Sequence, residues 1–255
     1  MKDIWTITKK ELKSFLYSPI AYILTAFFLL VSGFFFYNIL AWANDQAMRM
    51  MQSGQGMNRI NINQMLFEPF FNNMTIILMF LLPMLTMRLF ADEKKMRTEE
   101  LLLTSPLRLS AIIIGKYLAA LIIYAIILLL TATYGIFVFV YGNPELAPLL
   151  IAYLGLLLLG AVFIAIGLFA SALTENQVIA AVISFSSIIL IWVISWVGES
   201  GPGAWRGILT YLSFFSHFKN MASGVIDTQD IIYYLTFIFL SLYLTRSIFE
   251  FRKWR

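Results

Sequence analysis

The sequence predicts an all-α polytopic membrane protein with six transmembrane helices and both termini in the cytoplasm. Three observations predict this fold. The composition is 60% hydrophobic and 13% charged, whereas a soluble domain usually has about 25% charged residues. The apolar residues gather into runs close to the length that crosses a bilayer, which is about 20 residues. The basic residues are distributed unequally between the two sides that these runs define.

The expected spans form one transmembrane domain over residues 1–255. In chain order they are Ile20–Ala43, Phe70–Met87, Tyr117–Tyr141, Leu149–Ala172, Val178–Val197 and Ile231–Thr245. Their apolar bodies contain no Asp, Glu, Lys, Arg or His. Because charged groups inside a membrane usually mark ion or proton pathways, their absence here disfavours a proton-coupled carrier. Sodium coupling through carbonyl and hydroxyl oxygens stays open as the alternative of an ion-coupled secondary transporter.

The orientation follows from the basic residues. With six spans, fourteen of the 18 Lys and Arg residues lie on one side and four on the other. Cytoplasmic loops carry the excess of Lys and Arg, so both termini are expected in the cytoplasm. The net charge of +4 then reflects this topology and contact with anionic membrane lipid, and it indicates no nucleic-acid partner.

The segment before the first span has apolar residues at helical spacing with lysines between them. They include Ile4, Trp5, Thr8, Leu12 and Phe15. This pattern is typical of a helix that lies in the membrane interface. A simple basic anchor on the cytoplasmic side is equally compatible with it.

Two later spans carry small or polar residues on one helical face. In the fourth span these are Gly160, Gly167 and Ser171, which would let another helix approach closely. In the fifth span Ser184, Ser187 and Ser195 share a face. These serines are candidates for lining a transport path, but serine in a membrane helix also often bonds its own backbone or a neighbouring helix.

The stretch from Arg88 to Lys116 holds ten of the chain's thirty-two Asp, Glu, Lys and Arg residues. Nothing breaks a helix between Ala91 and Thr104, and Pro106 ends it. We therefore expect a short helix over residues 91–105, charged at its start and rich in leucine at its end. Periodicity alone leaves two interpretations, a solvated basic loop or a helix that contacts a cytoplasmic partner.

From Asp92 this stretch reads DEKKMRTEELLLTSPLRLSAIIIGK. It resembles the segment after the second span in ABC transporter permeases of the six-helix export class. That class has an acidic–basic run, Gly-Thr-x-Glu, several leucines, Ser-Pro and a later Gly-Lys. The matching residues are Glu93, Thr98, Glu100, Leu101, Leu102, Leu103, Ser105, Pro106, Gly115 and Lys116. Arg97 stands where the class usually has Gly.

A second stretch, Tyr211–Leu235, reads YLSFFSHFKNMASGVIDTQDIIYYL. It is similar to the Leu-Ser-Pro-x-x-His-Phe, Gly-x-Ile-Asp and Asp pattern before the last span of the same class. The residues that agree are Ser213, His217, Phe218, Gly224, Ile226, Asp227 and Asp230, while Phe214 replaces the usual Pro. The resemblance covers essentially the whole chain, and it is closest to the permease of the gliding-motility-type ABC transporter.

The resemblance implies a permease subunit of an ATP-driven exporter in the bacterial inner membrane. It implies a cytoplasmic ABC ATPase dimer that binds ATP and Mg²⁺, and a second permease, either another copy or a related chain. Some members of the class also act on an extracytoplasmic partner protein. The segment 204–225 would form a re-entrant or interfacial pair of short helices on the outer side.

The resemblance also implies a coupling helix that docks into the ATPase. We carry this role onto Glu93, Arg97, Thr98, Glu100, Leu101 and Leu102. The turn between spans four and five, Thr174, Glu175 and Asn176, is expected to touch the same partner.

The chain itself has no expected catalytic residue, metal site or cofactor. Gly115-Lys116 lacks the earlier Gly and the following Ser or Thr of a phosphate-binding loop. No cysteine is present, which excludes thiol catalysis. An intramembrane enzyme is a less favoured alternative, because it would need a base or a metal. The single histidine, His217, is expected outside the membrane, with Asp227 as its nearest acidic candidate.

Overall fold

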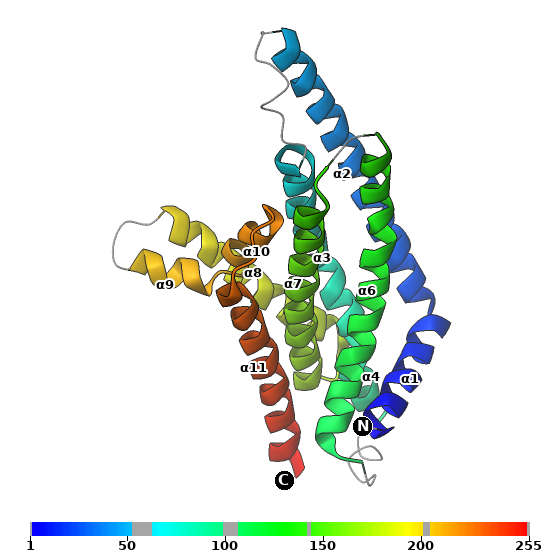
Figure 1. Cartoon of the computed structure of the whole chain (residues 1–255). Coiled ribbons are helices and arrows are strands. Elements are labelled where there is room, and N and C mark those ends of the chain that lie inside the picture. The colour runs from blue at the N-terminus through cyan, green and yellow to red at the C-terminus, as the bar shows by residue number, and fades with distance from the viewer. Residues whose placement is uncertain (1, 53–62, 99–106, 142–143, 201–204, 254–255) are drawn as a thin grey trace.

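The computed structural model describes residues 2–52, 63–98, 107–141, 144–200 and 205–253 (Figure 1). Within these ranges every regular element is a helix, so the predicted all-α class is confirmed. The elements are α1 (Lys2–Tyr17), α2 (Pro19–Gln52), the π-helical turn η2 (Asn63–Phe67), α3 (Glu68–Thr86), α4 (Arg88–Lys95), α6 (Leu109–Tyr141), α7 (Leu146–Leu173), α8 (Gln177–Ser200), α9 (Trp205–Leu212), α10 (Phe214–Ala222) and α11 (Thr228–Lys253).

Six helices in the described part of the chain are long and apolar enough to cross a membrane. They are α2, α3 together with α4, α6, α7, α8 and α11. The multi-pass fold predicted from hydropathy is confirmed. Both termini lie at the same end of the molecule, close to α4 (Figure 1), as an even number of spans requires.

The helices extend well beyond the apolar runs that predicted them. Helix α6 begins at Leu109 instead of Tyr117, and α2 continues past Ala43 to Gln52. The 34 residues of α2 correspond to about 51 Å at 1.5 Å per residue, against about 30 Å of hydrocarbon. The far end of α2 accordingly projects past the other helices (Figure 1). An apolar run marks only the section of a helix that meets lipid tails, because a helix can continue in water.

Helix α7 lies at the centre of the bundle and packs against α3, α6, α8, α10 and α11 (Figure 1). Its small residues make this possible, as their shared face predicts. A Cβ atom added to Gly160 would overlap the Tyr124 ring of α6, and one added to Gly167 would overlap the Thr86 hydroxyl of α3. Glycine therefore allows these helices to approach α7 more closely than any other residue would.

Helix α1 packs against the first part of α6 (Figure 1). The contact depends on Gly115 of α6, since a Cβ atom there would lie 2.8 Å from Ile7. The Thr8 hydroxyl donates a hydrogen bond to the Gly115 carbonyl oxygen at 3.2 Å. The helix expected before the first span is thus present, and its position in the membrane interface stays a prediction.

The expected continuous helix over residues 91–105 is wrong at one point. Helix α4 ends at Lys95, and Arg97 adopts a left-handed conformation with φ of 56°. The Arg97 amide bonds the Lys94 carbonyl at 3.0 Å and the Thr98 amide bonds the Glu93 carbonyl at 2.9 Å. This is the Schellman arrangement that terminates helices. Residues 99–105 of the expected helix lie outside the described ranges.

The segment 204–225, expected to hold two short helices, contains α9 and α10. Ser213 caps α10, because its side chain accepts a hydrogen bond from the Ser216 amide at 3.3 Å. Gly224 ends the pair with φ of 88°, and a Cβ atom there would lie 2.6 Å from Pro148. Both residues belong to the second sequence motif, so part of that motif determines where the short helices begin and end.

Candidate functional site

Helix α4 bonds other parts of the chain through three of its polar side chains, Arg88, Asp92 and Lys94. Arg88 Nη1 donates to Ser18 Oγ at 2.6 Å, next to the start of α2. Gln177 of α8 donates to Asp92, and Lys94 Nζ donates to the Ala172 carbonyl oxygen of α7. Lys94 also lies 5.5 Å from the centre of the Phe249 ring of α11. A displacement of α4 would therefore pull on the other helices that these contacts reach.

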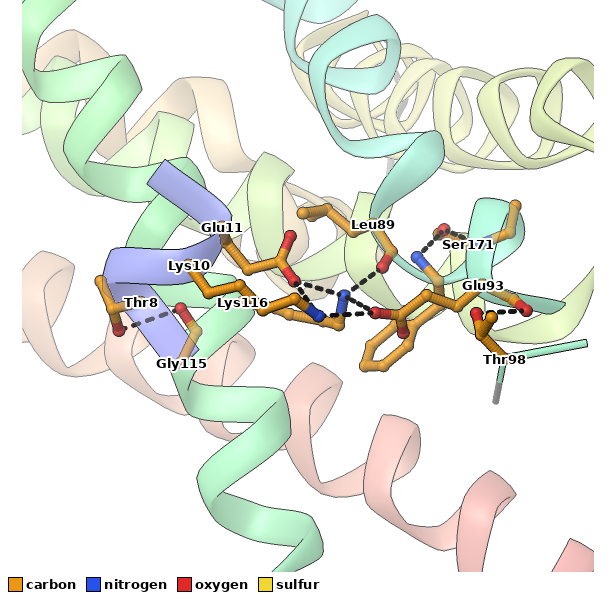
Figure 2. Close-up of polar contacts among 11 residues, drawn as sticks. Thr8, Lys10, Glu11, Leu89, Glu93, Thr98, Gly115, Lys116 and Ser171 are labelled. Atoms are coloured by element: carbon orange, nitrogen blue, oxygen red, sulfur yellow. Dashed lines mark hydrogen bonds and ion pairs between the residues drawn. The ribbon is translucent and has the colours of Figure 1, made fainter. Parts of the chain in front are cut away.

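Ser171 of α7 fastens the start of α4. Its hydroxyl oxygen accepts hydrogen bonds from the amides of Phe90 at 2.9 Å and Ala91 at 3.0 Å. The same hydroxyl donates to the Met87 carbonyl oxygen at 2.9 Å. Ser171 is fully buried, and part of this contact is drawn in Figure 2. The first turn of a helix has amides without intrahelical partners, and here another helix supplies the acceptor.

Lys116 of α6 joins α4 to α1. Its Nζ lies 2.9 Å from Glu93 Oε1, 3.0 Å from Glu11 Oε1 and 2.7 Å from the Leu89 carbonyl oxygen (Figure 2). The ring centre of Phe90 lies 5.1 Å away. The residue is only 1% exposed, and an ammonium has three N–H donors. All three are engaged, which is what a buried charge needs to be stable.

A polar cavity of about 340 Å³ lies beside this cluster. Its walls come mainly from α1 and α4, with Lys116 of α6 between them. The lining residues used below are Lys10 and Glu11 of α1 and Arg88, Asp92 and Glu93 of α4. The acidic and basic groups are nearly balanced, so the cavity has no strong preference for an anion or a cation.

The exposed part of this site begins at the last residue of α4 and continues beyond it. Lys95, Met96 and Arg97 are exposed, Met96 to 66%. Glu175 and Asn176, in the turn between α7 and α8, are also exposed. Ala172 in the last turn of α7 and Gln177 at the start of α8 lie on either side of this turn, and both bond directly to α4. The structure thus places the described part of the first predicted contact segment, which ends at Thr98, close to the Thr174–Asn176 turn.

The individual predicted coupling residues differ in placement. Glu93 faces the interior and binds Lys116, so it positions α4. The Thr98 hydroxyl donates to the Glu93 carbonyl oxygen at 3.2 Å (Figure 2). The Thr174 hydroxyl accepts from the Asn176 amide at 3.1 Å, and Asn176 Oδ1 accepts from the Val178 amide at 2.9 Å. Glu100, Leu101 and Leu102 lie outside the described residues.

The serines proposed to line a path occupy different environments. The Ser187 hydroxyl donates to the Ile183 carbonyl oxygen at 2.8 Å, which is the backbone alternative raised from the sequence. Ser184 is 1% exposed and lies against α7, since a Cβ atom on Gly167 would be 3.3 Å from its hydroxyl oxygen. The side chain of Ser195 is outside the described part of the structure. A path along this face stays a prediction.

A second buried polar group joins α10 to α11. His217 Nδ1 lies 2.5 Å from Asp230 Oδ1, and His217 Nε2 lies 2.9 Å from the Tyr211 carbonyl oxygen. A carbonyl oxygen can only accept, so Nε2 is the donor in the contact with Tyr211. Tyr233 stacks on the imidazole at 4.0 Å between ring centres.

The acidic partner of His217 is Asp230, and not Asp227, the nearest acidic candidate in the sequence. Asp227 instead accepts from the Gln229 amide at 3.0 Å at the start of α11. Asp230 is one turn further along, where a helical side chain faces α10. Among the described residues, no group of three or more His, Cys, Asp or Glu could hold a metal ion.

Sequence reasoning missed the partners of α4 within the chain. Asp92, Lys94 and Gln177 were not singled out, and Lys116 was noted only as part of a motif. The sequence does contain one signal for Lys116. It is the one charged residue between Ile112 and Tyr141, a section of α6 in which the other residues are apolar or are Thr, Tyr or Gly. A charge at such a place usually has a partner.

The family comparison agrees with this architecture. No curated protein matches the chain. The family model described as ABC-2 family transporter protein matches residues 5–250, which is nearly the whole chain and includes α4, the Lys116 cluster and the His217–Asp230 pair. The protein therefore belongs to the ABC-2 transporter family and is a multi-pass permease subunit of an ABC transporter.

Proposed function

We propose that this permease is driven by a cytoplasmic ABC ATPase dimer that docks on the segment following α4 and on the Thr174–Asn176 turn. One observation carries the proposal. The polar side chains of α4 bond α7, α8 and α6, while the residues directly after α4 are exposed. A partner that moved this exposed segment would move a helix bonded to most of the bundle. Glu93 acts as a positioning residue in this scheme, and Arg97, Thr98 and Glu175 lie at or beside the contact.

The energy source is assigned to the partner. ATP and Mg²⁺ bind to the ATPase subunits, because the permease sequence lacks a phosphate-binding loop. The direction is export across the bacterial inner membrane, by similarity to the six-helix export class. The permease pairs with a second copy or with a related permease. The ATP-driven movement either transports a substrate or, as in some members of that class, performs work on an extracytoplasmic partner protein.

The docking proposal is tested by co-purification of the ATPase. We expect Glu100→Arg and Leu101→Asp to abolish its association, because they reverse a charge and remove an apolar contact on the docking segment. Both variants should retain the thermal unfolding temperature of the wild-type permease. The matched control is Glu250→Arg on α11, an exposed glutamate paired with Arg246. Undiminished ATPase recovery with both docking variants would contradict the assignment.

A further inference from the structure

The first helix and the fourth are joined across a cavity by one buried cation. Glu11 is on α1, Glu93 is on α4, and Lys116, on α6, contacts both carboxylates at 3.0 and 2.9 Å (Figure 2). The cavity of about 340 Å³ separates the neighbouring parts of α1 and α4. The cavity leaves room for α1 and α4 to move relative to each other, whereas the ion pairs of Lys116 with Glu11 and Glu93 oppose that movement.

The cluster is electrically balanced. Lys10 Nζ lies 3.9 Å from both Glu11 Oε1 and Glu93 Oε1, and its side chain is 68% exposed. Two lysines therefore face two glutamates, but only Lys116 is buried. Removing one carboxylate would leave the buried ammonium with an unpaired donor, so displacing α4 alone is unfavourable unless the cluster moves with it.

Other contacts hold α1 in both of its halves, so the whole helix would move together when α4 moves. Gly115 allows α1 to lie directly on α6, with the Thr8 hydroxyl bonded to the Gly115 carbonyl oxygen. At the other end of α1, Arg88 of α4 donates to Ser18, and the Arg88 guanidinium lies 4.6 Å from the centre of the Phe15 ring. Two separate contacts thus connect α4 with α1 and its end.

We propose that Lys116, Glu11 and Glu93 make α1 a moving part of the coupling apparatus. When α4 moves, Glu93 pulls on the Lys116 ammonium, and the ammonium pulls on Glu11. Helix α1 therefore moves together with α4. Lys116 is a positioning residue in this scheme. The inference rests on the proposed ATPase docking, because that docking supplies the movement of α4.

The experiment measures two distances in the permease–ATPase complex with and without ATP. The chain has no cysteine, so spin labels can be placed at chosen sites. One pair joins Lys9→Cys on α1 to Tyr243→Cys on α11, and the other joins Lys95→Cys at the end of α4 to the same reference. Labelled permease is diluted with unlabelled permease so that each complex carries one pair. We expect both distances to change on ATP addition.

Glu11→Gln should keep the ATP-dependent change of the Lys95 pair and reduce that of the Lys9 pair by more than half. Glu250→Gln, which breaks an exposed ion pair, should change neither. If Glu11→Gln does not fold, the triple variant Glu11→Gln/Glu93→Gln/Lys116→Met removes the buried ammonium together with both of its carboxylate partners and should give the same result.

Three outcomes are distinguishable. A Lys9 pair that ignores ATP while the Lys95 pair responds overturns the inference and leaves the docking proposal standing. A Lys9 pair that still moves fully in Glu11→Gln also overturns the inference. Failure of the ATPase to associate, or a Lys95 pair that ignores ATP, overturns the docking proposal and the inference with it.

Discussion

At the scale of single residues, one hydroxyl and one backbone angle determine how α4 begins and ends. Met87, at the N-cap position of α4, makes no side-chain cap. Ser171 replaces it from α7. At the other end, Arg97 occupies the left-handed position that favours glycine. The export class that the sequence resembles usually has Gly there, and the backbone geometry gives a physical reason for that preference.

Ser171→Ala should lower the free energy of unfolding by about 1–3 kcal/mol, because two buried amides and a carbonyl lose their partner. Thermal unfolding in detergent measures the effect. The matched control is Ser187→Ala, whose hydroxyl bonds only its own helix backbone and which should have a much smaller effect. Equal shifts for the two variants would contradict the capping role.

Arg97→Gly should raise the free energy of unfolding by about 1 kcal/mol, since a left-handed conformation costs a side chain about that much. Lys95→Gly, two residues earlier at the last position of α4, should lower it, because glycine is a poorer helix former than lysine. Unfolding curves of both variants should therefore shift in opposite directions. Shifts of the same sign would argue against strain at Arg97.

At the scale of elements, close packing around α7 organises the bundle. Its glycines meet side chains from a different helix at each level, Met221 of α10 at Gly155, Tyr124 of α6 at Gly160 and Thr86 of α3 at Gly167. The Tyr124 hydroxyl also donates to the Leu156 carbonyl oxygen at 2.6 Å. In a bilayer, such packing and interhelical hydrogen bonds replace the hydrophobic driving force between helices.

Gly167→Ala should destabilise the permease by about 1–3 kcal/mol, the usual range for overpacking, because its Cβ atom has no space beside Thr86. The control is Gly207→Ala in α9, where no heavy atom lies within 4 Å of an added Cβ atom. Alanine is the better helix former, so this variant should lose no stability. A thermal shift assay of both variants measures the difference, and a loss as large at Gly207 would contradict the packing argument.

At the scale of the whole molecule, α4 and both termini occur at one end (Figure 1). The turn between α7 and α8 lies beside α4, since Ala172 and Gln177 bond to it. The α9–α10 pair is fastened to α11 by the buried His217–Asp230 contact. The cluster around Lys116 and the one around His217 both hold their charges among partners, near helix starts at Leu109 and Thr228. Neither places an isolated charge in the middle of a span.

Sidedness is a prediction at this scale. A cysteine at position 95, in place of Lys95, should react only with a reagent on the cytoplasmic side of the membrane. Cysteines in place of Gln52 and Leu146 should react with a reagent added outside the cell. All three positions are exposed, so reactivity reports the side of the membrane. Labelling of intact cells with a membrane-impermeant maleimide measures it. The reverse pattern would contradict the orientation inferred from the basic residues.

The spans could be predicted because lipid tails impose a composition that is visible in any single run of residues. Their ends could not, since α2 and α6 continue where the side chains become polar. The break at Arg97 was missed for a related reason. No residue there forbids a helix, and the turn forms through backbone bonds from Arg97 and Thr98.

The sequence by itself therefore determined the all-α class, the six spans and the family, because hydropathy and motif order are local properties of the chain. Only the tertiary structure decided which charges pair. Lys116 pairs with Glu11, which is 105 residues away in the sequence, and with Glu93, which is 23 residues away. His217 contacts Asp230, although Asp227 is closer to it in the sequence. Such partners depend on which helix faces meet after packing, and hydropathy does not encode that geometry.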